Sequence, residues 1–179
     1  MIRTERLLLV PATLESTRAA LDGADALGAS LGAIVPETWP PEFLDGPALD
    51  FTIDRLAEGP EHEGWWLHFV VLDGAGSGRV LIGSAGYKGP PSEDGTVEVG
   101  YGIVSDHQRR GYASEATRGL LAHAFALPQV KRVIAETLPE LAPSIGVLRK
   151  CGFRLTGEGG EPGVIRFELT RAAYAQCVP

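Results

Sequence analysis

The chain has 179 residues, of which 44% are hydrophobic, and carries a formal net charge of −7. This length suits one domain with a full core, so we expect a single domain over residues 1–179. No stretch approaches the roughly 18 apolar residues that span a membrane, and the acidic balance argues against a nucleic-acid binder, which carries a basic stripe. The charged residues 1–6 are unlike a signal peptide, so we expect a soluble cytoplasmic protein with no membrane or nucleic-acid partner.

Cysteine and histidine indicate neither a disulfide framework nor a metal site. The chain has two cysteines, Cys151 and Cys177, too few for a disulfide scaffold. The four histidines lack the spacing of metal ligands; they are His62, His68, His107 and His123. We therefore expect no metal.

The N-terminal third alternates turn residues with short periodic segments. Residues 6–10 predict a strand, and residues 13–21 predict a helix that starts with capping chemistry at Thr13. Residues 22–46 are rich in Gly, Pro and Ala and predict a short helix followed by a long loop. Residues 47–58 predict another helix, because a proline in the first turn precedes apolar residues at helical spacing.

The period changes to that of strands in the middle of the chain. Residues 66–72 and 79–87 are apolar runs of strand length, joined by the glycine-rich residues 73–78. This glycine cluster predicts a hairpin turn and not a nucleotide-binding loop, because no helical pattern follows it. Residues 96–104 alternate strictly between apolar and other residues, which predicts a strand with one buried face that includes Tyr101.

The last third predicts a strand–helix–strand order. Helices are expected over residues 111–126 and 144–151, and strands over residues 130–137, 153–156 and 164–169. Together with the earlier segments, this order implies one α/β (α+β) domain with a mixed sheet.

The turn before the helix of residues 111–126 is the most informative segment. A helix start presents unpaired N–H groups and a partial positive charge. Gly111 lets a ligand approach the backbone closely, and small Ala113 keeps the first turn open. The main-chain N–H groups of residues 108–113 could therefore bind a pyrophosphate, with Arg109 and Arg110 adding charge-assisted contacts. The alternative is an ordinary strand–helix turn with two solvated arginines.

Four segments resemble the GNAT acetyltransferase superfamily, and in particular its RimJ/RimL type, the ribosomal-protein N-terminal acetyltransferases. The sequence Gln-Arg-Arg-Gly-Tyr-Ala at residues 108–113 is similar to the family's Gln/Arg-x-x-Gly-x-Gly/Ala motif. The other three segments are Thr-Glu-Arg-Leu-Leu-Leu at residues 4–9, Glu-Val-Gly-Tyr at residues 98–101, and residues 144–153. They occur in the family's order and cover about residues 2–172.

The resemblance implies a mixed, mostly antiparallel sheet of about seven strands that is flanked by helices and splays after the fourth strand. Acetyl-CoA would enter the opening, with its pantetheine pairing to the backbone of one strand and its pyrophosphate at the turn. The implied cofactor-binding residues are Ile103, Val104, Gln108, Arg109, Arg110, Gly111, Tyr112, Ala113 and Ser114. An amine would attack the thioester directly, without an acyl-enzyme at Cys151. One departure is Leu141, where the family usually has an Asn that bonds near the pantetheine.

The candidate catalytic residues are Glu98 and Ser144. Glu98 could act as a general base for the amine, directly or through water, or be a solvated strand residue; Glu158 is a reserve candidate. Ser144 could hydrogen-bond the leaving sulfur, or it could cap its own helix. Glu115 is expected to fix packing.

The acceptor is expected to be a primary amine, either a small molecule or a peptide N-terminus. A lysine amine, with a pKa near 10.4, costs roughly 3 kcal/mol more to deprotonate than an α-amino group with a pKa of about 7.7–8.0, so an α-amino group is the easier substrate. Alternatives are an antibiotic or polyamine acetyltransferase on the same fold, and a CoA-binding sensor without turnover. The protein would be a monomer or a homodimer.

Two groups of residues could form the acceptor site. Acidic residues beside a tryptophan-containing loop could attract a cation; they are Glu37, Glu42, Asp45 and Asp50. The tryptophans Trp39, Trp65 and Trp66 could line the site.

Overall fold

The computed structural model describes residues 1–74 and 78–177. Its strands are β1 (Ile2–Arg3), β2 (Leu7–Pro11), β3 (Leu67–Gly74), β4 (Gly78–Tyr87), β5 (Thr96–Ile103), β6 (Arg132–Thr137), β7 (Arg154–Glu158) and β8 (Ile165–Thr170). They form one eight-stranded sheet in the order β1-β2-β3-β4-β5-β6-β8-β7. Every neighbouring pair is antiparallel except β5 and β6, which are parallel. The expected mixed, mostly antiparallel sheet is confirmed, with one strand more than the seven expected because Ile2–Arg3 pairs with β2.

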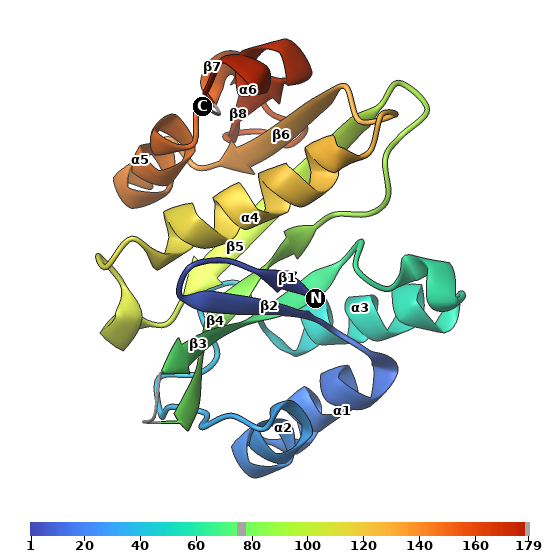
Figure 1. The fold of residues 1–179 in the computed structure, drawn as a ribbon, viewed down its shortest axis with the longest axis vertical. Helices are drawn as coiled ribbons and strands as arrows, with labels where there is room; N and C mark the ends of the chain where they lie inside the picture. Colours follow the sequence, from blue (N-terminus) through green and yellow to red (C-terminus); the bar gives the residue numbers. More distant parts are fainter. Residues whose placement is uncertain (75–77, 178–179) are drawn as a thin grey trace.

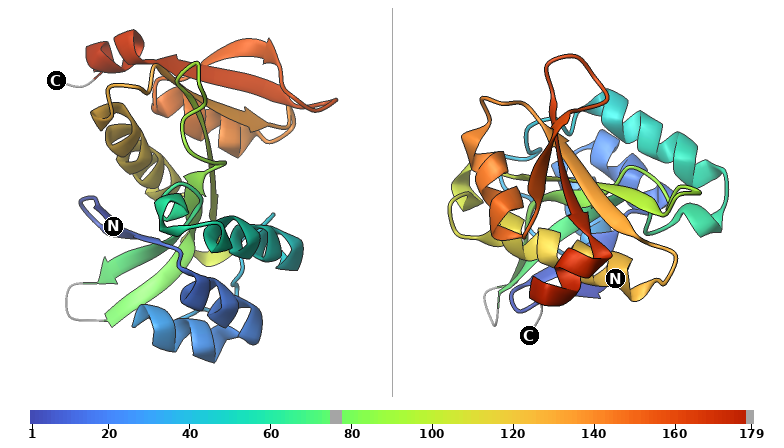
Figure 2. Two further views of the ribbon diagram at one scale, coloured as in Figure 1. Left: turned by 90° about the vertical axis from the view of Figure 1, so that its right-hand side faces the viewer. Right: turned by 90° about the horizontal axis from the view of Figure 1, so that it is seen from above.

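Helices cover both faces of this sheet (Figures 1 and 2). They are α1 (Leu14–Asp22), α2 (Ala24–Leu31), α3 (Gly46–Ala57), α4 (Tyr112–Ala126), α5 (Ala142–Lys150) and α6 (Arg171–Cys177), with short 3₁₀ turns at Pro60–His62 and Ser105–His107. One core cluster lies between the sheet and α4, and a second lies under α1, α2 and α3. Neighbours along β2 belong to different clusters, Leu7 and Leu9 to the first and Leu8 to the second, so this strand is buried on both faces.

Local capping chemistry sets the helix starts in the N-terminal third. Thr13 Oγ1 accepts a hydrogen bond from Ser16 N at 3.1 Å, and Ser16 Oγ accepts one from Thr13 N at 2.9 Å, which closes a capping box. Asp45 accepts from Ala48 N at 3.0 Å and caps α3 in the same way. Strands β3 and β4 pair as expected of a hairpin as far as Gly74 and Gly78. The predicted turn between them includes residues 75–77, which lie outside the described residues.

The C-terminal part differs from the expectation in two respects. Helix α5 begins at Ala142, two residues before the expected start, and α6 was not predicted. The guanidinium of Arg171, at the start of α6, donates to the backbone oxygens of Phe125, Leu127 and Val130 at 2.5–2.9 Å. Since the last carbonyls of a helix lack partners inside it, Arg171 stabilises the C-terminal end of α4.

The sheet opens between β5 and β6. These strands pair at three positions only, from Thr96↔Arg132 to Glu98↔Ile134. Beyond Glu98 the two strands have no paired residues, and the remainder of β5 is bonded to β4 alone. The expected splay after the fourth predicted strand, which is β5, is therefore present. No helix in the described part of the chain is long and apolar enough to cross a bilayer.

Candidate functional site

The open edge of β5 carries backbone groups that face the gap. Lys88 N donates to Glu98 O and Val104 N donates to Ile82 O, so the backbone of the even-numbered residues of β5 bonds to β4. Because a strand alternates the direction of its groups, the backbone of Tyr101 and Ile103 points into the opening. The Ile103 carbonyl accepts from Gln108 Nε2 at 2.8 Å. The backbone of Val104 does not face the opening in this way, since its N–H donates to Ile82 O and its oxygen accepts from His107 N.

The turn that follows β5 presents a run of free backbone donors. Arg109 has φ 61° and Gly111 has φ 85°, both left-handed, and α4 begins at the next residue with no side-chain cap. Backbone of alternating handedness points successive N–H groups to one side, which makes an anion-binding nest. Within residues 1–74 and 78–177, the N–H groups of residues 109–114 donate to no protein acceptor. With the positive end of the α4 dipole behind them, these donors suit a phosphate group.

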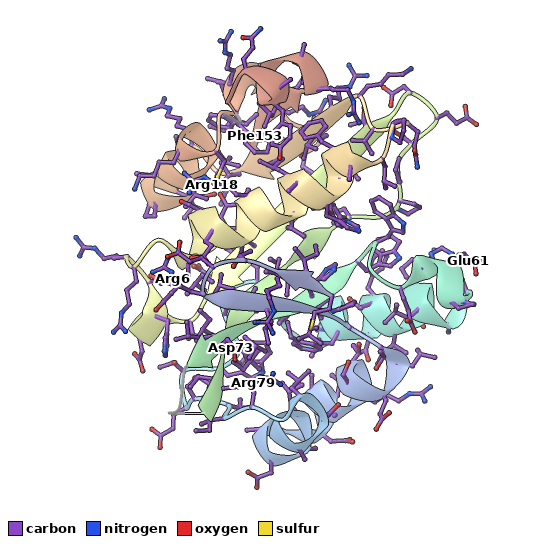
Figure 3. All side chains as sticks on the ribbon, viewed as in Figure 1. Arg6, Glu61, Asp73, Arg79, Arg118 and Phe153 are labelled. Atoms are coloured by element: carbon purple, nitrogen blue, oxygen red, sulfur yellow. The ribbon has the colours of Figure 1, made fainter. Side chains whose placement is uncertain are left out.

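The start of α4 is fixed by residues near the N-terminus. Glu115, in the first turn of α4, accepts from Thr4 Oγ1 at 2.6 Å and from the Arg6 backbone N–H at 2.7 Å. Its other oxygen bonds Arg6 Nε at 2.7 Å and Arg6 Nη2 at 2.6 Å. Partial burial opposes ionisation of Glu115, but the hydrogen bonds from Thr4 and Arg6 outweigh it and lower the pKa of the carboxyl. Figure 3 places the Arg6 side chain beside the start of α4. Glu115 therefore has the packing role expected from the sequence.

Glu98 lies on the face of β5 that is turned away from α4. Its neighbours on that face are Gly100 and Gly102, whereas Val97 and Val99 belong to the core under α4. The position of a Cβ at Gly100 would meet nothing within 4 Å, and that at Gly102 would lie 3.1 Å from Pro41 Cβ. The half-buried Glu98 carboxylate forms an ion pair with Lys88. A carboxylate thus lies at the narrow end of the sheet opening, on a face that is open beside Gly100 and covered by Pro41 at Gly102.

Ser144 is the third residue of α5 and lies across the opening from β5. Tyr101 Oη donates to the Ser144 carbonyl at 3.1 Å and is 3.4 Å from Ser144 Oγ. Burial raises the pKa of Tyr101 to about 12, so its hydroxyl keeps its proton at neutral pH. The helix N-cap is Leu141 and makes no side-chain cap bond. Ser144 therefore does not cap the helix, and Tyr101, which the alternation assigned to the core, is the polar contact that sequence reasoning missed.

Cys151 behaves as a small apolar residue. It is buried, and its thiol donates to Ser114 O at 3.5 Å. Burial raises the pKa of this thiol to about 11, so little of the reactive thiolate exists at neutral pH. This environment supports a direct transfer without an acyl-cysteine.

The other candidate residues are dispersed. Glu158 is exposed at the end of β7. The three tryptophans are half-buried in separate contacts, Trp39 with Phe69, Trp65 with Tyr87 and Trp66 with Phe51. In the described residues, no group of three or more His, Cys, Asp or Glu is arranged to hold a metal ion.

Comparisons with known proteins agree with this geometry. Residues 6–154 match the model of the acetyltransferase (GNAT) domain family. The chain is 31% identical over 103 residues to the uncharacterized N-acetyltransferase p20 of Bacillus licheniformis, which covers 53% of this chain and 58% of that protein. It is 32% identical over 81 residues to the uncharacterized N-acetyltransferase YjdG of Bacillus subtilis (45% of this chain, 48% of that protein). The chain thus spans about half the length of the curated relatives it matches.

Solved structures share the fold over nearly the whole chain. A GNAT-family acetyltransferase from Bacillus anthracis superimposes with a TM-score of 0.63 at 20% identity, covering 96% of this chain and 98% of that one. AAC(6')-Ib in complex with ribostamycin and coenzyme A gives 0.68 at 16% identity, covering 98% and 99%. A proposed ribosomal-protein-serine acetyltransferase from Vibrio cholerae gives 0.64 at 21% identity, covering 94% and 96%. From the family model, which matches most of its length, this chain belongs to the GNAT acetyltransferase domain family.

Proposed function

We propose that this protein is an acetyl-CoA-dependent N-acetyltransferase that transfers an acetyl group directly to a primary amine. The observation that carries the proposal is the run of free N–H groups at residues 109–114, which lies at the end of the same strand whose edge is left open. The free N–H groups suit a diphosphate, and the open strand edge suits an extended amide chain. AAC(6')-Ib, which shares the fold, is known in complex with coenzyme A.

Cofactor binding divides between two neighbouring parts of the backbone. The diphosphate would bind the N–H groups from Arg109 to Ser114, where the exposed side chains of Arg109 and Arg110 add positive charge. The pantetheine would pair with Tyr101 and with the N–H of Ile103, whose backbone faces the opening. Gln108 would affect cofactor binding only through Ile103, because its side chain donates a hydrogen bond to the Ile103 carbonyl. Val104, which the resemblance also assigned to cofactor binding, would not pair with the pantetheine, since its backbone groups are bonded within the fold.

The reaction requires one proton acceptor and stabilisation of the leaving sulfur. The neutral amine attacks the thioester carbonyl, a C–N bond forms, the C–S bond breaks, and the amine gives up one proton. Glu98 is the proposed base, on the open face of β5. Ser144 is proposed to donate a hydrogen bond to the departing sulfur, and Tyr101 would orient Ser144 through the contact at its backbone oxygen.

Charge distribution supports a cationic acceptor. Residues 37–63 contain eight acidic residues and one arginine, a net charge of −7 that equals the formal charge of the whole chain. This segment includes the loop whose Pro41 packs against Gly102 on the face that carries Glu98. An acidic region beside the acceptor side would steer an amine toward the site. We propose a protein or peptide N-terminal α-amino group as the acceptor, as in the RimJ/RimL type.

A second candidate is a small-molecule acetyltransferase. Its support is the fold similarity to AAC(6')-Ib, an aminoglycoside acetyltransferase with a known structure in complex with ribostamycin. A CoA-binding sensor is a third candidate, supported by Leu141, which occupies the position where the family usually has an Asn that bonds near the pantetheine.

Release of free thiol from acetyl-CoA tests the three candidates together. The assay uses pooled short peptides with free N-termini, the same peptides with blocked N-termini, polyamines and aminoglycosides. Thiol release that depends on a free N-terminus supports the proposed acceptor, and release with polyamines or aminoglycosides alone supports the small-molecule enzyme. Tight binding of coenzyme A with no release for any amine would support the sensor and refute the enzyme.

A further inference from the structure

The first turn of α4 is joined to the N-terminal segment by a polar contact that spans more than 100 residues of sequence. Glu115 accepts four hydrogen bonds or ion-pair contacts, all of 2.6–2.7 Å, from Thr4 and Arg6. The side chain of Glu115 is only 14% exposed, whereas that of Arg6 is 42% exposed. A carboxylate with this many donors is held in one position, because both of its oxygens are used.

Arg6 extends this contact to the turn itself. Its Nη1 donates to the Arg110 carbonyl at 3.3 Å. Its guanidinium lies over the Tyr112 ring, 4.5 Å from the centroid. A Cβ at Gly111 would lie 3.6 Å from Arg6 Nη2. One guanidinium therefore contacts Arg110 and Tyr112, the residues on either side of Gly111, in the turn that carries the free N–H groups.

We propose that Arg6 and Glu115 are positioning residues that hold the turn of residues 109–112 in the shape that binds the diphosphate. This inference rests on the proposed function. The turn needs such support because Arg109 is left-handed without being glycine, a conformation that the surrounding structure must impose. The neighbouring N–H groups also lack protein acceptors in the described residues, so no hydrogen bond of their own fixes their direction.

Glu115 also determines what Arg6 does. With its Nε and Nη2 on the carboxylate, the guanidinium is directed at the Arg110 carbonyl and the Tyr112 ring, and its charge is neutralised. Arg6 thus shapes the site and does not itself bind the anion. If Arg6 were instead an anion ligand that Glu115 restrains, removing the charge of Glu115 would raise the affinity for the diphosphate, whereas a positioning role predicts a lower affinity; the two roles are therefore separable.

The test compares two acyl donors in the full-length protein. Acetyl-CoA contains the diphosphate, whereas S-acetylpantetheine contains the same thioester and pantetheine without it. For Glu115→Gln we expect KM for acetyl-CoA to rise by about 10- to 100-fold, because a small misplacement of binding groups has effects of this order. We expect kcat to stay within about twofold, and kcat/KM for S-acetylpantetheine to be unchanged, since that donor does not use the turn.

Two further variants complete the design. Thr4→Val removes the 2.6 Å hydrogen bond from Thr4 to Glu115, together with the contacts of the same hydroxyl with the Leu7 backbone, and leaves Arg6 on the carboxylate. It should raise KM for acetyl-CoA severalfold in a folded protein. Arg3→Gln is the matched control, because it breaks the long-range ion pair of Arg3 with Asp73, away from the turn. It should leave kcat and KM unchanged for both donors.

The outcomes are distinct. Equal losses with both donors would show that Glu115 supports the fold in general, and a lower KM for acetyl-CoA would show that Arg6, once released, is an anion ligand; either result overturns the inference. If the unmodified protein uses both donors equally well, the turn binds no diphosphate and the inference is overturned although the acetyl transfer stands. If it uses neither donor, the proposed function itself is refuted.

Discussion

Replacement of Gly111 tests the diphosphate site most directly. Gly111 has φ 85°, and a Cβ there would meet only Arg6 Nη2 at 3.6 Å, an ordinary contact. The cost of any other residue is therefore that of the left-handed backbone, about 1–2 kcal/mol of folding free energy. Gly111→Ala, Gly111→Gln and Gly111→Glu should lower the free energy of unfolding by similar amounts, which urea titration measures.

Affinity for coenzyme A should separate the three variants. A carboxylate at residue 111 would lie roughly 5 Å from a diphosphate on the turn, which at an effective dielectric constant of about 20 gives a repulsion of about 3 kcal/mol per unit charge. At about 1.36 kcal/mol per tenfold change, Gly111→Glu should bind about 150-fold more weakly than Gly111→Gln, which has the same size. The difference should shrink as salt is raised, because exposed charges are screened.

Isothermal titration with coenzyme A at two salt concentrations measures these affinities. Equal binding by Gly111→Gln and Gly111→Glu would show that no phosphate lies close to residue 111. Affinity of all three variants equal to that of the unmodified protein would remove the turn from the cofactor site altogether.

The other predictions concern protonation and helix ends. His68 is buried and its pKa is lowered to about 4 from 6.5, so the unfolded chain takes up the proton first; the free energy of unfolding should fall by up to about 3 kcal/mol as pH falls from 6.5 to 4, and His68→Leu should abolish that part of the slope. Arg171→Met should lower the free energy of unfolding by about 2–3 kcal/mol, since three backbone oxygens lose a charged donor, whereas exposed Arg154→Met should change it by less than about 0.5 kcal/mol. Glu98→Gln should lower kcat more at low pH, where the amine is protonated, than at high pH, and Glu168→Gln, on the same face of the sheet, should leave the pH profile unaltered; an unchanged profile for Glu98→Gln would eliminate it as the base.

Sequence reasoning was accurate where the cause of a structure is local. The capping box at Thr13 needs only residues three apart, and the alternation in β5 needs only a strand with one buried face. Gly111 was singled out because glycine lets a ligand approach the backbone; the structure adds that this residue has a left-handed backbone, which also favours glycine.

The features that were missed depend on contacts between distant segments. Helix α6 is stabilised at its start by Arg171, which reaches the end of α4 more than 40 residues away. The expected start of α5 at Ser144 was late because nothing in the sequence caps the helix there; the chain already turns at Leu141. Tyr101 was assigned to the core by its place in the alternation, yet its ring is packed while its hydroxyl reaches α5. A tyrosine can bury its ring in the core while its hydroxyl makes a polar contact, so both roles are compatible with the sequence. Only the position of α5 shows that the hydroxyl has a partner there.

The two proposed cofactor subsites depend on one continuous segment, and this explains why the cofactor could be inferred before the acceptor. The open edge of β5 ends at Ile103, and the free N–H groups begin at Arg109, with Gln108 bonded back to the Ile103 carbonyl. A short sequence therefore carries both the strand that would pair with the pantetheine and the turn for the diphosphate. The proposed acceptor side has no such segment, since Pro41 and Glu98 come to the same face of the sheet from separate parts of the chain. If the proposed cofactor segment is right, we expect substitutions in the acidic residues 37–63 to change the preferred amine while use of the acyl donor is retained.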